Sequence, residues 1–178
     1  MTQPKRDTLR VLFLCTHNAA RSQMAEALLK QKADRLVPGR FEVASAGSHP
    51  GAAVHPLALQ TLSEHGIDWS GRRPKGIDQV LGQPWDLVIT VCDSAKESCP
   101  TLPGQPAFAH WGMDDPSDVG DDAGRRRAFR DAFNYLGRRI DLLLALPFES
   151  LERAALENQV RLIAAAAPVP RRPTAERP

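Results

Sequence analysis

The sequence predicts an α/β fold, a single domain with a mostly parallel β-sheet. Two observations carry this prediction. Short apolar runs alternate along the chain with longer amphipathic segments, which is the order expected when helices connect parallel strands. The chain has 178 residues, 42% of them hydrophobic and 25% charged, which is ordinary for a globular domain with one core.

The expected strands are short and apolar. Residues 10–14 predict the first strand, because Arg10 is followed by a continuous apolar run that suits a strand buried on both faces of the sheet. Residues 41–46 alternate into Gly47 and predict a second strand. Residues 87–91 predict a third buried strand, and residues 107–110 predict a weaker fourth.

The expected helices lie between these strands. Residues 22–32 repeat apolar side chains at helical spacing. Residues 56–65 begin with proline and are followed by Gly66, a pattern typical of a helix start and stop. Residues 124–146 carry the longest helical pattern in the chain.

The C-terminal part differs in composition, so we divide the chain into residues 1–147 and 148–178. The first part is the α/β domain. The second is a helical extension with a tail rich in proline and arginine. Apolar residues between 151 and 163 share one helical face, which predicts an extra packed helix, with a dimerisation element as the alternative. The final APVPRRPTAERP has the composition of a flexible linker.

Composition argues against several classes of function. The net charge is +2, and the basic residues do not gather with aromatic residues, so we expect no nucleic-acid partner. The first apolar run is too short for a signal peptide or a membrane span, so we expect a cytoplasmic protein without a membrane partner. Three cysteines in a reducing compartment indicate chemistry or core packing rather than structural disulfides.

Cys15 ends the first predicted strand and is the candidate nucleophile. Ligands bind at the carboxyl ends of strands in open parallel sheets, and a loop leading into a helix N-terminus suits an anion. A thiol in this position is expected to have a lowered pKa. Arg21 can bind two oxygens of an oxyanion, and Ser22 can donate its hydroxyl to the sulfur. The alternative is an inert, buried cysteine.

The predicted oxyanion-binding loop joins the first strand to the first helix. It consists of Thr16, His17, Asn18, Ala19, Ala20 and Arg21. Asn18 tolerates left-handed backbone angles, and its amide can brace the loop. His17 either contacts the oxyanion or faces solvent, and we favour solvent.

Cys92 follows the third predicted strand as Cys15 follows the first, and Cys99 lies seven residues further on. This spacing, with no histidine nearby, does not match zinc ligands, so we expect no metal site there. Cys99 lies in a polar stretch and is expected to be exposed. Two thiols in one short segment suit thiol–disulfide exchange, while two core cysteines remain the alternative.

The segment CTHNAARS resembles the phosphate-binding loop of the low-molecular-weight protein tyrosine phosphatases. The longer string CTHNAARSQMAEALL is similar to thioredoxin-coupled arsenate reductases that share that fold. The resemblance covers residues 9–146 and implies a four-stranded parallel sheet flanked by helices. It also implies that arsenate is the substrate, with phosphate and sulfate as analogues of it.

The resemblance further implies a relay of three thiols. Cys15 attacks arsenate, Cys92 attacks the Cys15 sulfur and releases arsenite, and Cys99 then takes the disulfide from Cys15–Cys92 to Cys92–Cys99. Thioredoxin is the implied electron donor. The alternatives are a phosphatase acting on phosphotyrosine or small phosphoesters, and a non-catalytic oxyanion-binding or redox-sensing module.

The segment HWGMDDPSD contains the candidate acid. Asp115, before Pro116, matches the Asp-Pro acid of the resembling families, and Asp114 is the second choice. The alternative is an ordinary turn. Ser117 stands where the phosphatases have aromatics that hold a phosphotyrosine ring, which implies a site for a small oxyanion.

Residues behind the loop complete the expected site. Ser45 matches a serine that hydrogen-bonds the loop asparagine, Asn18. Some of the resembling reductases hold K⁺ with residues matching Asn18, Glu26 and Ser45 and with an aspartate that falls near Lys75. The resemblance therefore implies either a K⁺ site or its replacement by the Lys75 ammonium, and no tightly bound cofactor.

Overall fold

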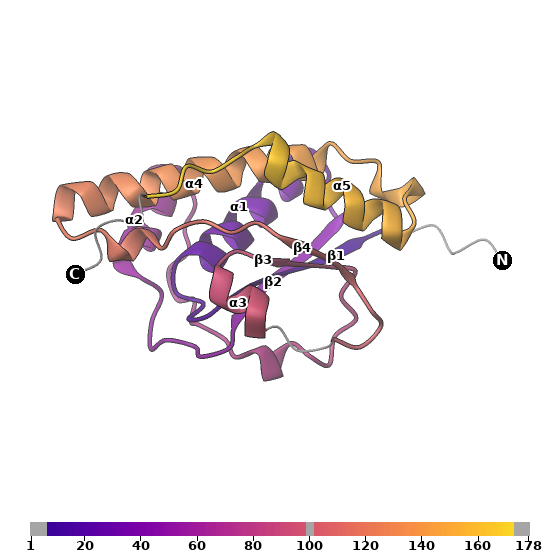
Figure 1. Ribbon diagram of the computed structural model, residues 1–178, viewed down its shortest axis with the longest axis horizontal. Helices are drawn as coiled ribbons and strands as arrows, with labels where there is room; N and C mark the ends of the chain where they lie inside the picture. Colours follow the sequence, from indigo (N-terminus) through magenta and orange to yellow (C-terminus); the bar gives the residue numbers. More distant parts are fainter. Residues whose placement is uncertain (1–6, 99–101, 173–178) are drawn as a thin grey trace.

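The computed structural model describes residues 7–98 and 102–172 (Figure 1). One sheet of parallel strands lies at its centre, in the order β2-β1-β3-β4. The strands are β1 (Leu9–Cys15), β2 (Phe41–Gly47), β3 (Leu87–Thr90) and β4 (Ala107–His110). The predicted α/β fold with four parallel strands is confirmed, and each expected strand is present within a residue of its predicted bounds.

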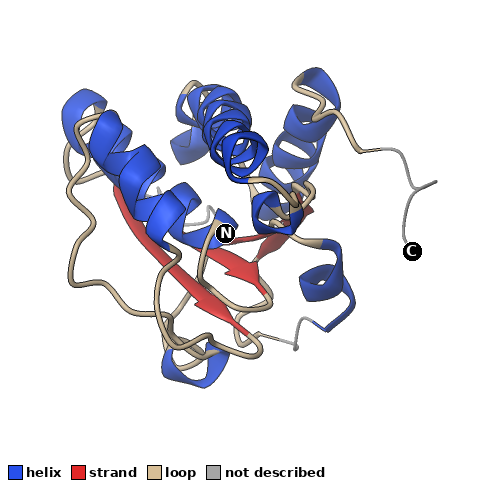
Figure 2. Ribbon diagram, turned by 90° about the vertical axis from the view of Figure 1, so that its left-hand side faces the viewer, coloured by secondary structure: helices blue, strands red, loops and turns tan. Residues whose placement is uncertain are grey.

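Helices lie in the connections between strands and after the last strand, and the longer ones lie together over one face of the sheet, as Figure 2 shows. They are α1 (Arg21–Leu36), α2 (Pro56–Glu64), α3 (Asp93–Ser98), α4 (Asp122–Leu144) and α5 (Arg153–Ala166). Three short 3₁₀ helices, η1 (Ile77–Gln79), η2 (Pro116–Asp118) and η3 (Phe148–Ser150), lie in the connections. Helix α1 packs on β2 and α4, and α5 packs on β4.

The central strand β1 is buried on both faces, as its apolar run predicts. Successive side chains of a strand point to opposite faces. Val11 and Phe13 accordingly pack in the large core beneath the helices. Leu12 and Leu14 pack in a smaller cluster on the other face, with Trp85 and Val88.

The strand order places two strand ends side by side. Strand β1 lies between β2 and β3, with Leu14 opposite Thr90 in the register. The connections from β1 and from β3 lead to opposite sides of the sheet, which is the kind of switch point where ligands bind in this architecture. Cys15 ends β1, and Cys92 follows β3 by two residues, so both cysteines lie at this edge.

The C-terminal part folds back onto the body. The extra helix is present as α5, and its buried residues Leu156, Val160 and Ile163 face the core. The expectation of a flexible linker after α5 is wrong for residues 167–172, because Val169 packs against the core and two arginines contact Asp114. Residues 173–178 lie outside the described part. None of the helices in the described ranges is both long and apolar enough to cross a membrane.

Candidate functional site

The loop between β1 and α1 is held from outside by the segment that follows β2. The carbonyl oxygens of Thr16, His17 and Ala19 accept hydrogen bonds from the N–H groups of His49, Gly51 and His55, at 2.8, 2.9 and 2.8 Å. In a trans peptide the C=O and the N–H point in opposite directions. The N–H groups of the loop therefore face inward, toward the thiol.

The start of α1 adds to this inward-facing set of donors. Ala20 is the N-cap residue, and no side chain caps the helix. The first N–H groups of a helix have no partner within the helix, and the helix dipole gives them partial positive charge. An uncapped helix start beside inward-facing loop amides is suited to bind an oxyanion.

Cys15 lies in the centre of this cradle and is 4% exposed. Its Sγ is 2.8 Å from the Ser22 Oγ, and it accepts a hydrogen bond from the N–H of Asn18 at 3.1 Å. Burial raises the pKa of the Cys15 thiol above its ordinary value, and the nearby Cys92 adds to the rise. Ser22, Arg21 and the Asn18 N–H lower the pKa, but by less. The expected low pKa is therefore wrong for the ligand-free loop.

Asn18 braces the loop as expected. Its φ of 50° is left-handed, a conformation that asparagine tolerates better than most residues. Its Nδ2 donates to Ser22 Oγ at 2.8 Å and to Ser45 Oγ at 2.9 Å. Its Oδ1 accepts from Gln23 Nε2 and from the Lys75 N–H, both at 2.9 Å. The fully buried amide thus ties the loop to α1, β2 and the segment before β3.

Two neighbours of Asn18 were not identified from the sequence. Gln23 is fully buried and accepts a hydrogen bond from the Trp69 indole at 2.8 Å. Gly47 ends β2 so close to the loop that an added Cβ would lie 2.5 Å from the Thr16 carbonyl oxygen. The only sequence signals were a polar residue on the apolar side of α1 and a glycine ending a strand.

A buried carboxylate lies behind Asn18. Glu26 is 4% exposed, and its Oε2 accepts a hydrogen bond from Ser45 Oγ at 2.6 Å. The Lys75 ammonium lies 3.7 Å from the same oxygen. A buried carboxylate needs a compensating charge and hydrogen bonds, and Lys75 and Ser45 supply them here.

Arg21 is turned toward the candidate acid. Its Nη1 donates to the Met113 carbonyl oxygen at 2.8 Å, and its Nη2 lies 3.3 Å from Asp115 Oδ2. The other oxygen, Asp115 Oδ1, accepts from the N–H and the hydroxyl of Ser117, at 2.9 and 2.7 Å. Burial raises the pKa of the Asp115 carboxyl, but Arg21, Ser117 and His17 together outweigh burial and leave the pKa below its ordinary value.

Asp114, the second choice for the acid, faces elsewhere. Its carboxylate accepts hydrogen bonds from the Arg171 side chain at 3.1 Å and from the Arg172 N–H at 2.7 Å. Asp115 is therefore the carboxylate that contacts Arg21 in this structure. His17 is exposed, as expected, with its Nδ1 3.1 Å from the His49 carbonyl oxygen.

Cys92 lies at the rim of the same cradle. Its thiol is free, it is 4% exposed, and its Sγ is 3.4 Å from Thr16 Oγ1. The third cysteine, Cys99, lies outside the described residues. Within residues 7–98 and 102–172, no three histidine, cysteine, aspartate or glutamate side chains gather in a way that could hold a metal ion.

Comparison with known proteins matches the part of the chain that carries this site to one family. Residues 10–161 match the family described as low molecular weight phosphotyrosine protein phosphatase. An arsenate reductase from Halalkalibacterium halodurans is 39% identical over 131 residues, which are 73% of this chain and 91% of that protein.

Two solved structures are similar in fold. A thioredoxin-dependent arsenate reductase from Corynebacterium glutamicum is 34% identical with a TM-score of 0.58, over 77% of this chain. This chain spans only 60% of that structure's length. A low molecular weight protein tyrosine phosphatase from T. tengcongensis is 27% identical with a TM-score of 0.65, over 77% of this chain and 98% of that one.

The family match begins within β1 and ends within α5, so it includes the loop, Cys92 and the Asp115 segment, and it extends past residue 146. The chain belongs to the low molecular weight phosphotyrosine protein phosphatase family.

Proposed function

We propose that this protein reduces arsenate to arsenite in the cytoplasm, with thioredoxin as the electron donor. The observation that carries the proposal is the second free thiol, Cys92, beside the loop that surrounds Cys15. An oxyanion cradle with one thiol can hydrolyse a phosphoester. A second thiol within reach of the first can take over its covalent adduct and complete a reduction.

In the first step Cys15 and arsenate condense. The sulfur attacks arsenic, an S–As bond forms, and one arsenate oxygen leaves as water. The inward-facing N–H groups and the start of α1 hold the remaining oxygens. Burial in the empty loop raises the pKa of the Cys15 thiol and so favours its protonated form, and in this step the thiol proton passes to the bound oxyanion.

The leaving oxygen needs a proton, and Asp115 is the proposed donor. In the ligand-free site Arg21 holds this carboxyl ionised. A bound oxyanion competes for the Arg21 guanidinium and brings negative charge close to Asp115. Both changes raise the pKa of Asp115, so substrate binding favours the protonated carboxyl that can donate to the leaving oxygen.

In the second step Cys92 attacks the Cys15 sulfur. An S–S bond forms, and the proton of the Cys92 thiol passes to an arsenic-bound oxygen. The S–As bond breaks and its electron pair stays on arsenic, which falls from arsenic(V) to arsenic(III) and leaves as arsenite. Cys15 ends β1, and the Cys92 Sγ lies 3.4 Å from the Oγ1 of Thr16, the residue that follows Cys15. The two thiols therefore lie at the same edge of the sheet.

In the third step Cys99 attacks Cys92, so that the disulfide moves to Cys92–Cys99 and Cys15 is freed. Helix α3 fills the segment between these two cysteines, and its six residues rise by about 9 Å. A disulfide spans less than this, so α3 must unwind at least in part. A dithiol such as thioredoxin then reduces the Cys92–Cys99 disulfide by exchange and becomes oxidised itself.

Hydrolysis of small aryl phosphates is the second candidate activity. The same loop, Arg21 and Asp115 are the groups that phosphoester hydrolysis needs, and phosphate has nearly the shape and charge of arsenate. Ser117 uses its hydroxyl to hold Asp115 and offers no aromatic face to a phosphotyrosine ring. We therefore propose this hydrolysis as a weak side activity of the same site.

We also propose that Lys75 takes the place of a bound monovalent cation behind the loop. The Lys75 ammonium lies 3.7 Å from the buried Glu26 carboxylate, and the backbone N–H of Lys75 donates a hydrogen bond to Asn18 Oδ1. These contacts support an internal cation that balances Glu26, with the Ser45 hydroxyl completing the arrangement.

The proposed function is tested by comparing two activities in four proteins. Oxidation of NADPH is followed with thioredoxin, thioredoxin reductase and arsenate, and hydrolysis of an aryl phosphate is followed separately. The wild type is compared with Cys15→Ser, Cys92→Ser and Cys99→Ser. We expect Cys15→Ser to lose both activities, and the other two variants to lose only multi-turnover reduction. Normal reduction of arsenate by both Cys92→Ser and Cys99→Ser would contradict the relay.

A further inference from the structure

The chain returns to the candidate active site after α5. We call residues 167–172 the C-terminal strap. It begins at Ala167, whose carbonyl oxygen accepts a hydrogen bond from the buried Arg139 at 3.1 Å. It ends at Arg171 and Arg172, beside the acid-bearing segment. The family match ends at residue 161, so the strap lies beyond it.

Arg171 joins two parts of the proposed relay. Its Nη2 lies 3.3 Å from Asp93 Oδ1, and its Nη1 lies 3.1 Å from Asp114 Oδ1. Asp93 is the first residue of α3 and directly follows Cys92. Asp114 directly precedes the proposed acid. One guanidinium therefore contacts both the start of α3, next to Cys92, and the segment that carries Asp114 and Asp115, which we call the acid segment.

A second contact holds the same oxygen of Asp93. The Asp93 Oδ1 lies 2.9 Å from His110 Nε2, and the Nδ1 of the same ring is 2.7 Å from Thr90 Oγ1. His110 ends β4, and Thr90 ends β3. The position of Cys92 is thus set by the sheet through His110 and by the strap through Arg171.

Arg172 contacts the acid segment alone. Its N–H donates to Asp114 Oδ2 at 2.7 Å, and its Nη2 donates to the Asp115 carbonyl oxygen at 2.8 Å. Its described contacts do not include α3. The two neighbouring arginines therefore form a natural pair for comparison, in which only Arg171 touches the residue next to Cys92.

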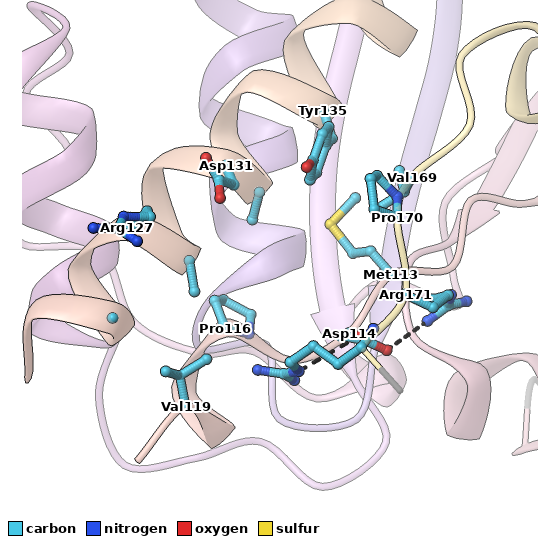
Figure 3. Close-up of a pocket in the computed structure, with 14 residues that line it drawn as sticks. Met113, Asp114, Pro116, Val119, Arg127, Asp131, Tyr135, Val169, Pro170 and Arg171 are labelled. Carbon is cyan, nitrogen blue, oxygen red and sulfur yellow. Dashed lines mark hydrogen bonds and ion pairs between the residues drawn. The ribbon is translucent and has the colours of Figure 1, made fainter. Parts of the chain in front are cut away.

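The end of the strap is held mainly by these polar contacts. A hollow of about 390 Å³ lies between the strap and α4, as Figure 3 shows, with Val169 and Pro170 on one side and Arg127, Asp131 and Tyr135 on the other. Close packing against α4 is therefore interrupted beneath the strap. Loss of an arginine contact is expected to loosen the strap's end rather than the core.

We propose that Arg171 is a positioning residue for the thiol relay, which rests on the proposed arsenate reduction. By holding Asp93 it keeps the start of α3, and with it the Cys92 thiol, against the Cys15 loop while the rest of α3 unwinds. Without this contact Cys92 spends less time within reach of the Cys15 adduct. Attack on the Cys15 sulfur, and with it arsenite release, becomes slower.

The expected effect is modest because the contact is partly exposed. The Arg171 side chain is 42% exposed and that of Asp93 67%. Ion pairs of this kind are weak and are screened by salt, so we expect a change of about two- to five-fold in rate. The wild-type rate should fall toward that of an Arg171 variant as ionic strength rises at saturating arsenate.

The test uses the full chain with three strap variants and one control. Arg171→Gln removes both contacts, and Arg171→Lys keeps the charge without the planar fork. Arg172→Gln removes only the side-chain contacts of Arg172 with the acid segment and keeps its backbone N–H bond to Asp114. Arg153→Gln is the matched control, because the 47% exposed Arg153 pairs with Glu157 within α5 and its described contacts include neither α3 nor the acid segment. Reduced protein is mixed with arsenate without thioredoxin, and arsenite release is timed. Hydrolysis of an aryl phosphate, which does not need Cys92, is measured in parallel.

We expect Arg171→Gln to release arsenite about two- to five-fold more slowly than Arg172→Gln, with equal aryl phosphate hydrolysis in the two. Arg171→Lys should lie between Arg171→Gln and the wild type. Equal arsenite release in Arg171→Gln and Arg172→Gln would overturn the inference. The Arg153→Gln rate should match the wild type.

A second measurement keeps the inference independent of the proposed activity. Cys92 is 4% exposed, so alkylation by iodoacetamide requires the start of α3 to open. In a protein that carries Cys15→Ser and Cys99→Ser, adding Arg171→Gln should raise the alkylation rate about two- to five-fold. An unchanged alkylation rate would overturn the positioning role. If the wild type released no arsenite, the proposed function would fail, and alkylation would still decide the role of Arg171.

Discussion

Replacing Asn18 with alanine removes the side chain that ties the oxyanion loop to the rest of the fold. Asn18 makes four side-chain hydrogen bonds in a fully buried position, and its backbone is left-handed. At about 1 kcal/mol for each buried hydrogen bond, their loss costs about 4 kcal/mol. Alanine in a left-handed conformation adds about 1 kcal/mol.

The expected total for Asn18→Ala is therefore about 5 kcal/mol in the free energy of unfolding. A chain of this size loses about 2–4 °C in Tm per kcal/mol, so the Tm should fall by about 10–20 °C. Urea denaturation followed by circular dichroism measures the free energy, and a thermal scan measures the Tm. Arsenite release should fall as well, because Ser22 and the loop lose their brace.

Asn18→Gly is the matched control for the backbone. Glycine loses the same four hydrogen bonds but adopts the left-handed conformation freely, so it should be more stable than Asn18→Ala by about 1 kcal/mol. If Asn18→Ala lost less than about 1 kcal/mol, the hydrogen bonds would not hold the loop as described. Equal stability of the two variants would refute the argument from backbone strain.

Three further predictions concern the parts around Asn18. Gly47→Ala places a Cβ 2.5 Å from a loop carbonyl oxygen and should abolish arsenite release. Gly51→Ala is the control, because its Cβ would have its nearest contact at 3.7 Å, and it should retain arsenite release. Equal rates of arsenite release in the two variants would contradict the close approach of Gly47 to the loop. Ser22→Ala removes a hydrogen bond that lowers the pKa of Cys15, so the pKa should rise further and iodoacetamide should alkylate Cys15 more slowly at fixed pH. Faster alkylation of Cys15 in Ser22→Ala would contradict the role of Ser22 in lowering the pKa of Cys15. Lys75→Gln should lower the Tm and make it respond to K⁺, with the wild type indifferent in a potassium titration. Several-fold activation of the wild type by K⁺ would rule out the lysine as its replacement.

The order and type of the main elements followed from local patterns. Apolar runs and helical periodicity predicted the four strands and the long helices, because burial on a sheet or beneath a helix imposes those patterns on the sequence. The position of Cys15 at the carboxyl end of a strand was also predictable from the sequence, because a cysteine between a buried strand and an amphipathic helix has few places to lie in an α/β fold.

The direction of the Cys15 pKa did not follow from the sequence. The loop, the helix start and Arg21 all favour the thiolate, and they were visible in the motif. The extent of burial was not, and burial outweighs them in the ligand-free site. Arg21 also forms an ion pair with Asp115, which lies 94 positions away in the sequence and comes near only in the folded chain.

The contacts of the strap were equally hidden. A segment such as APVPRR reads as a linker because nothing in its composition requires a partner. Its partners, Asp93 and Asp114, come from two other regions of the chain and meet the arginines only after α5 has packed on β4. Long-range pairing of exposed charges leaves no periodic signal in a sequence.

The central claim is that Cys15 attacks arsenate and Cys92 resolves the adduct. It is tested most directly by a single turnover in the Cys99→Ser variant, where the relay must stop after its second step. Reduced protein is mixed with arsenate, arsenite is quantified, and the disulfides are mapped on proteolytic peptides. We predict one arsenite for each chain and a Cys15–Cys92 disulfide. Arsenite released without that disulfide, or no arsenite at all, would contradict the account.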